Sequence, residues 1–445
     1  MIRRALFHNF RLVYALDRWL RQRFTKAGFL VLMGLVSSII FGVDTQQSLA
    51  YQLGALLGSV LLIAIVHSIF IRLNFKALRE LPRFATVGEI FHYRIKVYNH
   101  TAHPQASISI VESITPIPPS YTTFLHAKEP LRHTRNWFDN YIGYPRWMWL
   151  MYYNRGANTF EQLAPVLPLG STHAVEVDMR LLPLRRGYVH LRGINFICPD
   201  PFGICNRLYH YKLPEDILVL PKRYPIPTLN ILGKRKYQRG GVQLAMAVGD
   251  SQEFVSLRDY RAGDPLRNIH WKSFAKSGEP VVKEYQDEFF IRHALLLDTF
   301  TPTSVGEQFE AAVSIAASLA CAPRHQDALL DLLFIGNEAY CFTSGRGLSS
   351  EANLLEVLAC VEPNPNLPFS SLQVLLAQHL NSLSSCIGIF LHWDEERAHL
   401  LKILEMAGVA VLILLVCEHV PENLPNTVRQ IRPHALAEDL NQLLS

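Results

Sequence analysis

Two long uncharged apolar runs near the N-terminus constrain the fold of this chain most strongly. Residues 27–43 contain no charged side chain, and a second uncharged run covers residues 49–71 after the short connector "DTQQS". A helix of about 20 apolar residues crosses a hydrocarbon core of roughly 30 Å. We therefore expect two transmembrane helices within residues 27–75, with a buried helical hairpin of a soluble protein as the alternative.

The charges around these runs predict their orientation. The basic leader, residues 1–26, carries seven arginines and lysines against the single acidic residue Asp17, the connector carries only Asp44, and Arg72 follows the second run. Positive charge concentrates on the cytoplasmic side of membrane proteins. We expect a two-span protein of the cytoplasmic (inner) membrane with both termini in the cytoplasm. The long basic leader and the second span disfavour a cleaved signal peptide.

Composition excludes several classes of protein. The net charge of +5 is modest for 445 residues, so it does not indicate a nucleic-acid partner. The seven cysteines form no CxxC pair, and several lie in apolar runs such as "SSCIGIF". This pattern favours reduced, buried thiols in the cytosol over disulfides or a zinc site.

Residues 80–220 are expected to form a β-rich, sandwich-like domain. Stretches such as "EIFHYRIKVYNH" and "HAVEVDMRLLPL" alternate apolar and polar residues between Pro and Gly breaks. Such period-2 patterns are typical of antiparallel sheets with one solvated face. Residues 135–156 interrupt the pattern with many Trp and Tyr residues. They form either a loop or hairpin folded onto the sandwich, or an exposed aromatic and arginine surface for a partner or the bilayer interface.

A sharp turn is predicted at Asp200, Pro201, Phe202 and Gly203. Pro201 presets the backbone for a turn, and Gly203 permits a positive φ. Phe202 is expected to pin the turn into the core.

A short polar segment with Arg, Asp, His, Trp and Lys in close order lies within residues 221–289, which connect the β-rich half to the C-terminal half. Asp264 is a good helix N-cap and Pro265 suits the first helical position. The helix should continue through "LRNIHWKSFAKS" to a stop at Gly278. Strands are expected on both sides, at "EFVSLRDYRAGD" and "EPVVKEYQDE".

From residue 290 to residue 445 the chain alternates apolar strands with helices. Continuous apolar strands such as "HALLLD" and "VAVLILLVC" predict a parallel sheet that is covered on both faces. Ligands of such sheets bind at the carboxyl ends of the strands. The sequence contains no Walker A, HExxH, GxSxG or dinucleotide-type glycine motif, which disfavours several classes of enzyme.

The polar segment closely resembles the signature of the domain of unknown function 58 family. The matching positions are Tyr260, Gly263, Asp264, Arg267, Ile269, His270, Trp271, Lys272, Ala275 and Gly278. The family also has an Arg-Gly strand before an Asp-Pro-Phe-Gly turn, matched here by Arg186, Gly187 and residues 200–203. Its members commonly begin with two membrane spans. The C-terminal part looks like a von Willebrand factor type A domain, which the family often carries.

This resemblance implies a bacterial, membrane-anchored scaffold or adaptor that is not an enzyme. The implied partner is a MoxR-type AAA+ ATPase, in the assembly or maturation of client proteins. The candidate contact residues are Arg258, Tyr260, Arg261, Gly263, Asp264, Arg267, His270, Trp271 and Lys272. The same residues could instead form a buried polar network that ties strand to helix. As a further alternative, Asp264, His270 and the arginines could form an enzyme site for an anionic or envelope-related substrate.

The type A resemblance also implies a divalent-cation site, which this sequence lacks in part. The family motif is Asp-x-Ser-x-Ser at the end of the first strand, and here Asp298 is followed by Phe300 and Pro302 in the two Ser positions. Thr299 and Thr301 offer oxygens out of register, and hard cations need several correctly placed oxygens. We expect no cofactor, and Asp298 is expected to act as a helix-side cap. A metal-dependent adhesion module is the remaining alternative.

Overall fold

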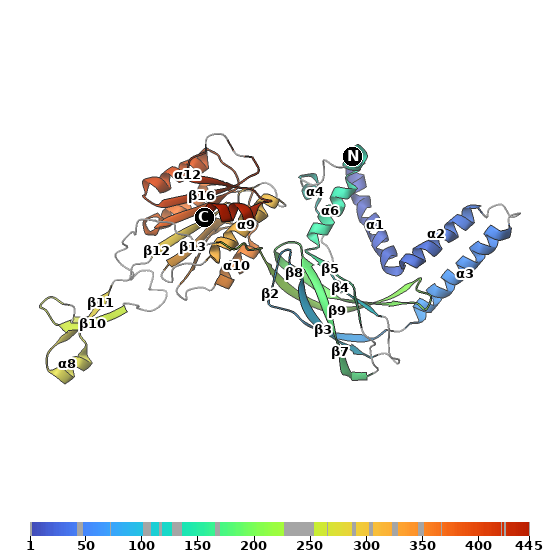
Figure 1. Cartoon of the computed structure of the whole chain (residues 1–445), viewed down its shortest axis with the longest axis horizontal. Helices are drawn as coiled ribbons and strands as arrows, with labels where there is room; N and C mark the ends of the chain where they lie inside the picture. Colours follow the sequence, from blue (N-terminus) through green and yellow to red (C-terminus); the bar gives the residue numbers. More distant parts are fainter. Residues whose placement is uncertain are drawn as a thin grey trace. The chain divides into compact units, whose positions relative to one another are not determined.

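The computed structural model divides into two compact units (Figure 1). It describes residues 2–41, 48–71, 73–100, 108–114, 118–126, 136–164, 170–226, 253–264, 266–286, 291–301, 306–322, 328–345, 351–365, 367–419, 421 and 424–444. The first unit is Met1–Lys222 with Thr303–Gly306 and Leu355–Val361, and the second comprises the rest.

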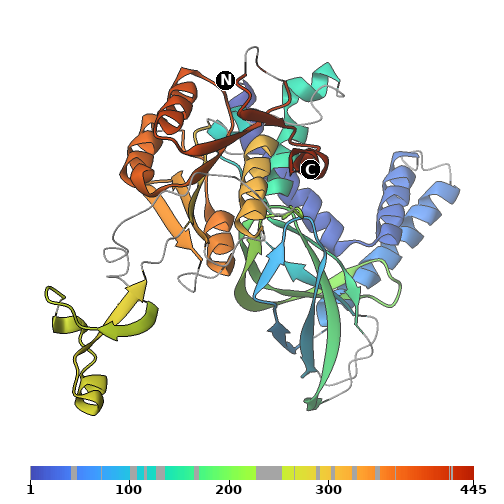
Figure 2. The same ribbon diagram turned by 60° about the vertical axis from the view of Figure 1, so that its left-hand side comes forward.

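The first unit begins with three helices, α1 (Ile2–Arg23), α2 (Lys26–Phe41) and α3 (Ser48–Phe70). Helices α2 and α3 run side by side (Figures 1 and 2). Among the described residues, one helix is long and apolar enough to cross a membrane, the 22 residues Leu49–Phe70 of α3. Helix α2 has 16 residues and falls short of that length. One of the two predicted spans is therefore supported, which is weak evidence of a membrane anchor.

The middle of the chain forms two β-sheets. The first has the order β1-β3-β7-β5, with strands Phe75–Glu80, Phe91–Asn99, Gly170–Pro183 and Ala157–Thr159. The second has the order β2-β9-β8-β4-β6, with strands Phe84–Thr86, Asn206–Leu220, Gly187–Pro199, Ser109–Ser113 and Gln162–Leu163. Side chains from both sheets, among them Ile95, Met179 and Phe196, form one buried cluster. The predicted alternation is present, because residues of β1 are alternately buried and exposed.

The aromatic insert forms helices, so the predicted loop is wrong. Helices α5 (Trp137–Ile142) and α6 (Tyr144–Asn154) meet at Gly143, whose φ of 77° ends α5; the short helix α4 (Tyr121–His126) precedes them. Trp147 of α6 is buried in a cluster with Phe7 and Phe10 of α1. The insert thus packs on the N-terminal helix. The sequence of residues 135–156 could not predict this, because the aromatic partners on α1 lie far away in the chain.

The second unit contains a six-stranded sheet of order β14-β13-β12-β15-β16-β17. Its strands are Ala339–Ser344, Ala328–Ile335, Ile291–Leu297, Ser385–Phe390, Ala410–Val416 and Val428–Ile431. All neighbours pair in parallel except β14, which is an antiparallel edge strand. Successive residues Leu295 and Leu296 point to opposite faces and are both fully buried. Both faces of the sheet are therefore covered, as the apolar strands predicted.

Helices connect these strands, and they include α9, α10, α11, α12 and α13 (Glu307–Ala320, Glu351–Cys360, Ser370–His379, Glu395–Met406 and Leu436–Leu444). Helix α9 carries alanines on its buried face and packs on β12, β15 and β16. All seven cysteines are free thiols.

Candidate functional site

The signature segment is a β-hairpin that carries a short helix. Strands β10 (Glu253–Asp259) and β11 (Val281–Gln286) pair antiparallel. Between them lie a 3₁₀ turn at Leu266–Asn268 and helix α8 (Trp271–Ser277). The helix ends at Gly278, whose φ is 75° and whose N–H donates to the carbonyl of Phe274, as predicted.

The continuous helix predicted from Asp264 is wrong. Ile269 leaves the helical path and forms a β-bridge with Val282, and the N–H of His270 donates to the carbonyl of Val281 at 2.8 Å. The backbone in the middle of the predicted helix therefore pairs with strand β11 and does not continue as an α-helix. Ile269 and Val282 are both buried, and this apolar contact joins the 3₁₀ turn to the hairpin.

Asp264 closes the turn before the 3₁₀ segment instead of capping a helix. Its two carboxylate oxygens accept hydrogen bonds from the guanidinium of Arg258 at 2.7 and 2.8 Å, and one also accepts from the N–H of Arg261 at 2.9 Å. Gly263 permits this turn with a φ of 110°. The hydrogen bonds from Arg258 and from Arg261 lower the pKa of Asp264 to about 2.

His270 and Tyr260 also have local partners. Nδ1 of His270 lies 2.6 Å from the hydroxyl oxygen of Ser273, and the N–H of Tyr260 donates to the carbonyl of Pro280 at 3.0 Å. The structure thus pairs Asp264 with Arg258 and His270 with Ser273. The two residues predicted as a base and its orienting acid have different partners.

The rest of the signature lies at the surface. The side chain of Trp271 is 61% exposed and that of Leu266 is 65% exposed. Arg261, Arg267 and Lys272 are exposed as well. We call these five residues the signature surface. The Arg258–Asp264 pair ties strand β10 to the turn, as the polar-network interpretation predicted, but its side chains are 35% and 17% exposed, so the network is not buried.

The Asp-Pro-Phe-Gly turn is built around a buried aspartate. The N–H of Gly203 donates to the carbonyl of Asp200 at 2.9 Å, and Gly203 has the predicted positive φ, 64°. One carboxylate oxygen of Asp200 accepts from the N–H groups of Ile204 and Cys205 at 2.6 and 2.9 Å. The prediction for Phe202 is wrong, because this side chain is mostly exposed. Ile204 and Cys205 enter the core instead.

This turn holds the junction between α1 and α2. The N–H of Thr25 donates to the carbonyl of Ile204 at 3.1 Å, and its hydroxyl donates to the carbonyl of Gly203. At Gly28 a Cβ atom would lie 2.2 Å from the carbonyl oxygen of Ile204, so only glycine allows this approach. Ile204 also packs on Ala64 of α3. The motif thus fastens the apolar helices to the β-rich domain.

Asp298, at the end of β12, is fully buried and faces an arginine. One carboxylate oxygen accepts from the Nε and Nη2 atoms of Arg397 at 2.8 and 2.6 Å and from the N–H of Leu391 at 3.1 Å. The other accepts from the N–H of Phe300 at 3.0 Å. Burial raises the pKa of Asp298, and the guanidinium of Arg397 opposes that rise. The predicted helix-side cap is therefore replaced by a buried ion pair.

The two threonines beside Asp298 are also buried. The hydroxyl of Thr299 donates to the carbonyl of Ile335 at 2.5 Å, and the N–H of Thr301 donates to the carbonyl of Thr299 at 3.1 Å. Thr299 is thus occupied by the neighbouring strand. Around Asp298 the described polar partners are mainly N–H donors, which is a poor environment for a cation.

A second buried pair lies across β12 and β13. Asp331 accepts from Arg292 and from the hydroxyl of Thr343 at 2.6 Å. Within the described parts of the chain, Asp331, Cys341 and His379 are the one group of three potential metal ligands that lie within 4.8 Å of one another. Arg292 already provides the positive charge beside this carboxylate.

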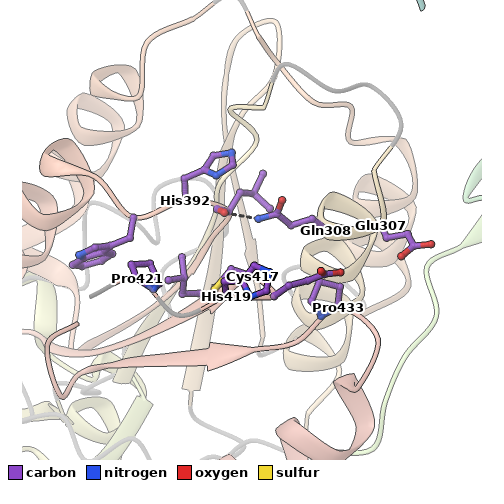
Figure 3. A pocket seen from close by; sticks show the side chains of 11 residues that line it. Glu307, Gln308, His392, Cys417, His419, Pro421 and Pro433 are labelled. Carbon is purple, nitrogen blue, oxygen red and sulfur yellow. Dashed lines mark hydrogen bonds between the residues drawn. The ribbon is translucent and has the colours of Figure 1, made fainter. Parts of the chain in front are cut away.

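A pocket of about 470 Å³ opens where the predicted ligand end of the sheet lies (Figure 3). It is bounded by the residues after β15 and β16 and by the first turn of α9, including Glu307, His392, Trp393, Cys417 and His419. Gln308 crosses it and donates to the carbonyls of Leu391 and Val416. None of the residues predicted as candidates lines this pocket. The sequence did contain a signal for this pocket, because the runs "LHW" and "VCEH" each place a His residue shortly after an apolar strand.

Comparisons with known proteins agree with part of this description. Residues 256–430 match the family model described as protein of unknown function DUF58. The uncharacterized protein YeaD of Bacillus subtilis (strain 168) is 23% identical over 201 residues, which are 44% of this chain and 48% of that protein. The chain thus spans about half the length of this curated relative.

Among solved structures, a cohesin module from a Clostridium perfringens family 33 glycoside hydrolase aligns with 33% of this chain and 98% of its own length. Its identity is 8% and its TM-score is 0.15, which is too low to assign a fold. The match that carries weight is the family model. It covers most of the signature hairpin and the six-stranded sheet, and over these residues it confirms the resemblance to the domain of unknown function 58 family.

Proposed function

We propose that this protein is a membrane-anchored, non-enzymatic scaffold or adaptor that works with a MoxR-type AAA+ ATPase in the assembly or maturation of other proteins. The observation that carries the proposal is the signature surface, in which Trp271 is exposed and the nearby Arg267 and Lys272 are exposed as well. The identity of the partner comes from the family resemblance alone. The side chains of the signature surface indicate which charge and shape the partner's binding surface should have.

The signature surface suits a protein contact. Trp and Arg are enriched among the few residues that dominate binding energy at interfaces. An exposed Trp buries a large area at a small entropic cost, because its side chain has only two rotatable bonds. Exposed Arg261, Arg267 and Lys272 give the surface a positive charge. The complementary partner surface should be acidic with an apolar pocket for the indole ring.

The hairpin presents this surface in a fixed arrangement. The two hydrogen bonds between Arg258 and Asp264 close the turn, and the Ile269–Val282 bridge joins the middle of the segment to β11. A preformed surface loses less conformational entropy on binding than a flexible one. In this proposal Arg258 and Asp264 position the contact residues, and they make no contact themselves.

We propose that α2 and α3 together form a two-span membrane hairpin with both termini in the cytoplasm. Small residues line the contact between these helices: a Cβ atom at Gly34 would lie 3.1 Å from Leu57, and one at Gly54 would lie 3.3 Å from Ser38. Spacings of four residues between small side chains, as at Gly54 and Gly58, are typical of helix pairs in membranes. The outer sides expose large apolar residues such as Leu30 and Leu56, which lipid would cover.

For the C-terminal sheet we propose a von Willebrand factor type A-like domain that works without a divalent cation. Five parallel strands with an antiparallel edge strand support the fold. The pairing of Arg397 with Asp298 supports the proposal that no divalent cation is needed, because the guanidinium already neutralises this carboxylate. The domain would then contact partners through side chains and not through a bound metal.

The test is capture of the purified ATPase by the full-length protein in detergent. Trp271→Ala and Arg267→Ala should each weaken capture by about tenfold or more, because interface residues of this kind contribute about 2 kcal/mol or more. Trp137→Ala is the matched control, since Trp137 is an exposed Trp on α5. All three variants should keep the wild-type unfolding midpoint. Unchanged capture by both signature variants would contradict the proposal.

A further inference from the structure

Helix α1 has two apolar faces, and among the described residues one face is covered by protein while the other stays largely exposed. Phe7, Phe10 and Tyr14 pack against α4 and α6. Leu12, Leu16 and Trp19 follow one another at spacings of four and three residues, so they share a different face. Their side chains are 70%, 60% and 53% exposed.

This second face is too apolar for an ordinary solvated surface. Three large apolar side chains in one row form a contiguous patch, and such patches mark sites of interaction. The aromatic insert already occupies the other face of α1, and Gly143 allows this packing because it approaches Phe124 closely. The row of Leu12, Leu16 and Trp19 therefore serves a different contact.

The charge of α1 identifies the chemistry of that contact. Of the residues in the basic leader, Arg11 and Arg21 are exposed and Arg18 is partly exposed. The only acidic residue, Asp17, is engaged by Arg21 at 2.9 Å. A helix that combines an apolar stripe containing Trp with an excess of arginine is typical of helices that lie in the interface of an anionic membrane.

The position of α1 in the chain fits this surface. Only Phe24 and Thr25 separate α1 from α2, and Thr25 is bound to the Asp-Pro-Phe-Gly turn. This attachment holds the end of α1 at the point where the chain enters α2. If α2 and α3 are anchored in the bilayer, the C-terminal end of α1 lies at the membrane surface.

We propose that α1 lies in the interface of an anionic bilayer, with Leu12, Leu16 and Trp19 inserted below the headgroups and Arg11 and Arg18 near lipid phosphates. This inference rests on the proposed membrane anchor and adds a second, lipid-selective attachment to it. The attachment fixes the β-rich domain at the membrane surface, because α1 is packed on α6 and its end is bound to the turn after β8.

The test places the full-length protein in lipid nanodiscs that contain brominated lipids, which quench tryptophan fluorescence on contact. In discs of phosphatidylcholine and phosphatidylglycerol, quenching should be clearly smaller for Trp19→Phe than for the wild type. Trp271→Phe is the matched control and should leave the amount of fluorescence that the brominated lipids quench unchanged, since Trp271 belongs to the signature surface.

A charge-reversed variant tests the lipid selectivity. Arg11→Glu combined with Arg18→Glu should lose the part of the quenching that Trp19 contributes, whereas Arg429→Glu, an exposed arginine in β17, should not. Discs of phosphatidylcholine alone should give less Trp19 quenching than the anionic discs. If the protein enters the discs and Trp19 is not quenched, the inference about α1 is wrong and the anchor stands. If the protein does not enter discs at all, the anchor itself is wrong.

Discussion

Asp298 and Asp264 are both paired with an arginine, yet their surroundings are opposite. In the pair at the end of β12, the side chains of Arg397 and Asp298 are 5% and 0% exposed. In the signature hairpin, the side chains of Arg258 and Asp264 are 35% and 17% exposed. Each carboxylate accepts two hydrogen bonds from its guanidinium. Hydrogen bonding is therefore similar, and the main difference is access to water.

This difference separates a structural pair from one that shapes a surface. A buried charge that loses its partner has no water to replace it, whereas an exposed charge is readily solvated. Arg397 is thus tied to the stability of the sheet. We expect changes at Arg258 and Asp264 to leave the rest of the second unit folded and to act only on the hairpin and its contacts.

The largest effect is expected from breaking the buried pair. Arg397→Met leaves the Asp298 carboxylate without its cation, and removing one partner of a buried ion pair lowers the free energy of unfolding by about 3–5 kcal/mol. Hydrogen exchange of the amides in β12 and β15, followed by mass spectrometry on the full-length protein, measures this loss. If the amides of Arg397→Met exchange as slowly as those of the wild type, the prediction is wrong and water must solvate the Asp298 carboxylate.

The double variant Asp298→Asn with Arg397→Met provides the control, because the amide oxygen of Asn can still accept from a backbone N–H group that Asp298 contacts. Because neither charge remains, it should recover a large part of the stability that the single variant loses. A double variant that is less stable than the single variant would show that the pair itself, and not the unpaired charge, dominates.

Asp200 adds an intermediate case, because it is buried but accepts backbone hydrogen bonds instead of facing an arginine. Asp200→Ala leaves the N–H groups of Ile204 and Cys205 without their acceptor. Unsatisfied buried donors cost about 1–3 kcal/mol. We expect faster amide exchange in this turn and in the first turn of α2. Asp216→Ala, an exposed aspartate in β9, is the matched control; equal effects of the two variants would contradict this account.

Local patterns predicted much of the fold, and distant contacts explain the differences. Period-2 alternation and continuous apolar runs identified the sheets, and Gly203 and Gly278 have the expected positive φ. The predicted helix from Asp264 failed because Ile269 pairs with Val282, which lies in the next strand. The role of Asp298 depends on Arg397, 99 residues further along the chain. No local pattern contains either partner.

The exposed pair is expected to affect only the hairpin. Asp264→Asn removes the charge that Arg258 and the N–H of Arg261 contact, so amide exchange in β10 and β11 should become faster. Exchange in β12 and β15 should stay at the wild-type rate, in contrast to Arg397→Met. Lys272→Ala, which changes an exposed residue of the signature surface, serves as the control and should leave both regions unchanged. Slower folding or faster exchange throughout the sheet would show that the hairpin supports the second unit.

The smallest effect is a pH dependence confined to the same hairpin. The folded state lowers the pKa of Asp264 from 3.8 to about 2, with the hydrogen bonds from Arg258 as the main cause. A lowered pKa means that the carboxylate stabilises the hairpin fully above its ordinary pKa and loses this contribution as the pH falls toward 2. The exchange rates of β10 and β11, corrected for intrinsic exchange, should therefore differ between the wild type and Asp264→Asn at neutral pH. The two should converge between about pH 4 and pH 2. A difference that is as large at pH 2 as at neutral pH would mean that Asp264 holds the turn by shape and not by charge, and the comparison with Asp298 would then rest on burial alone.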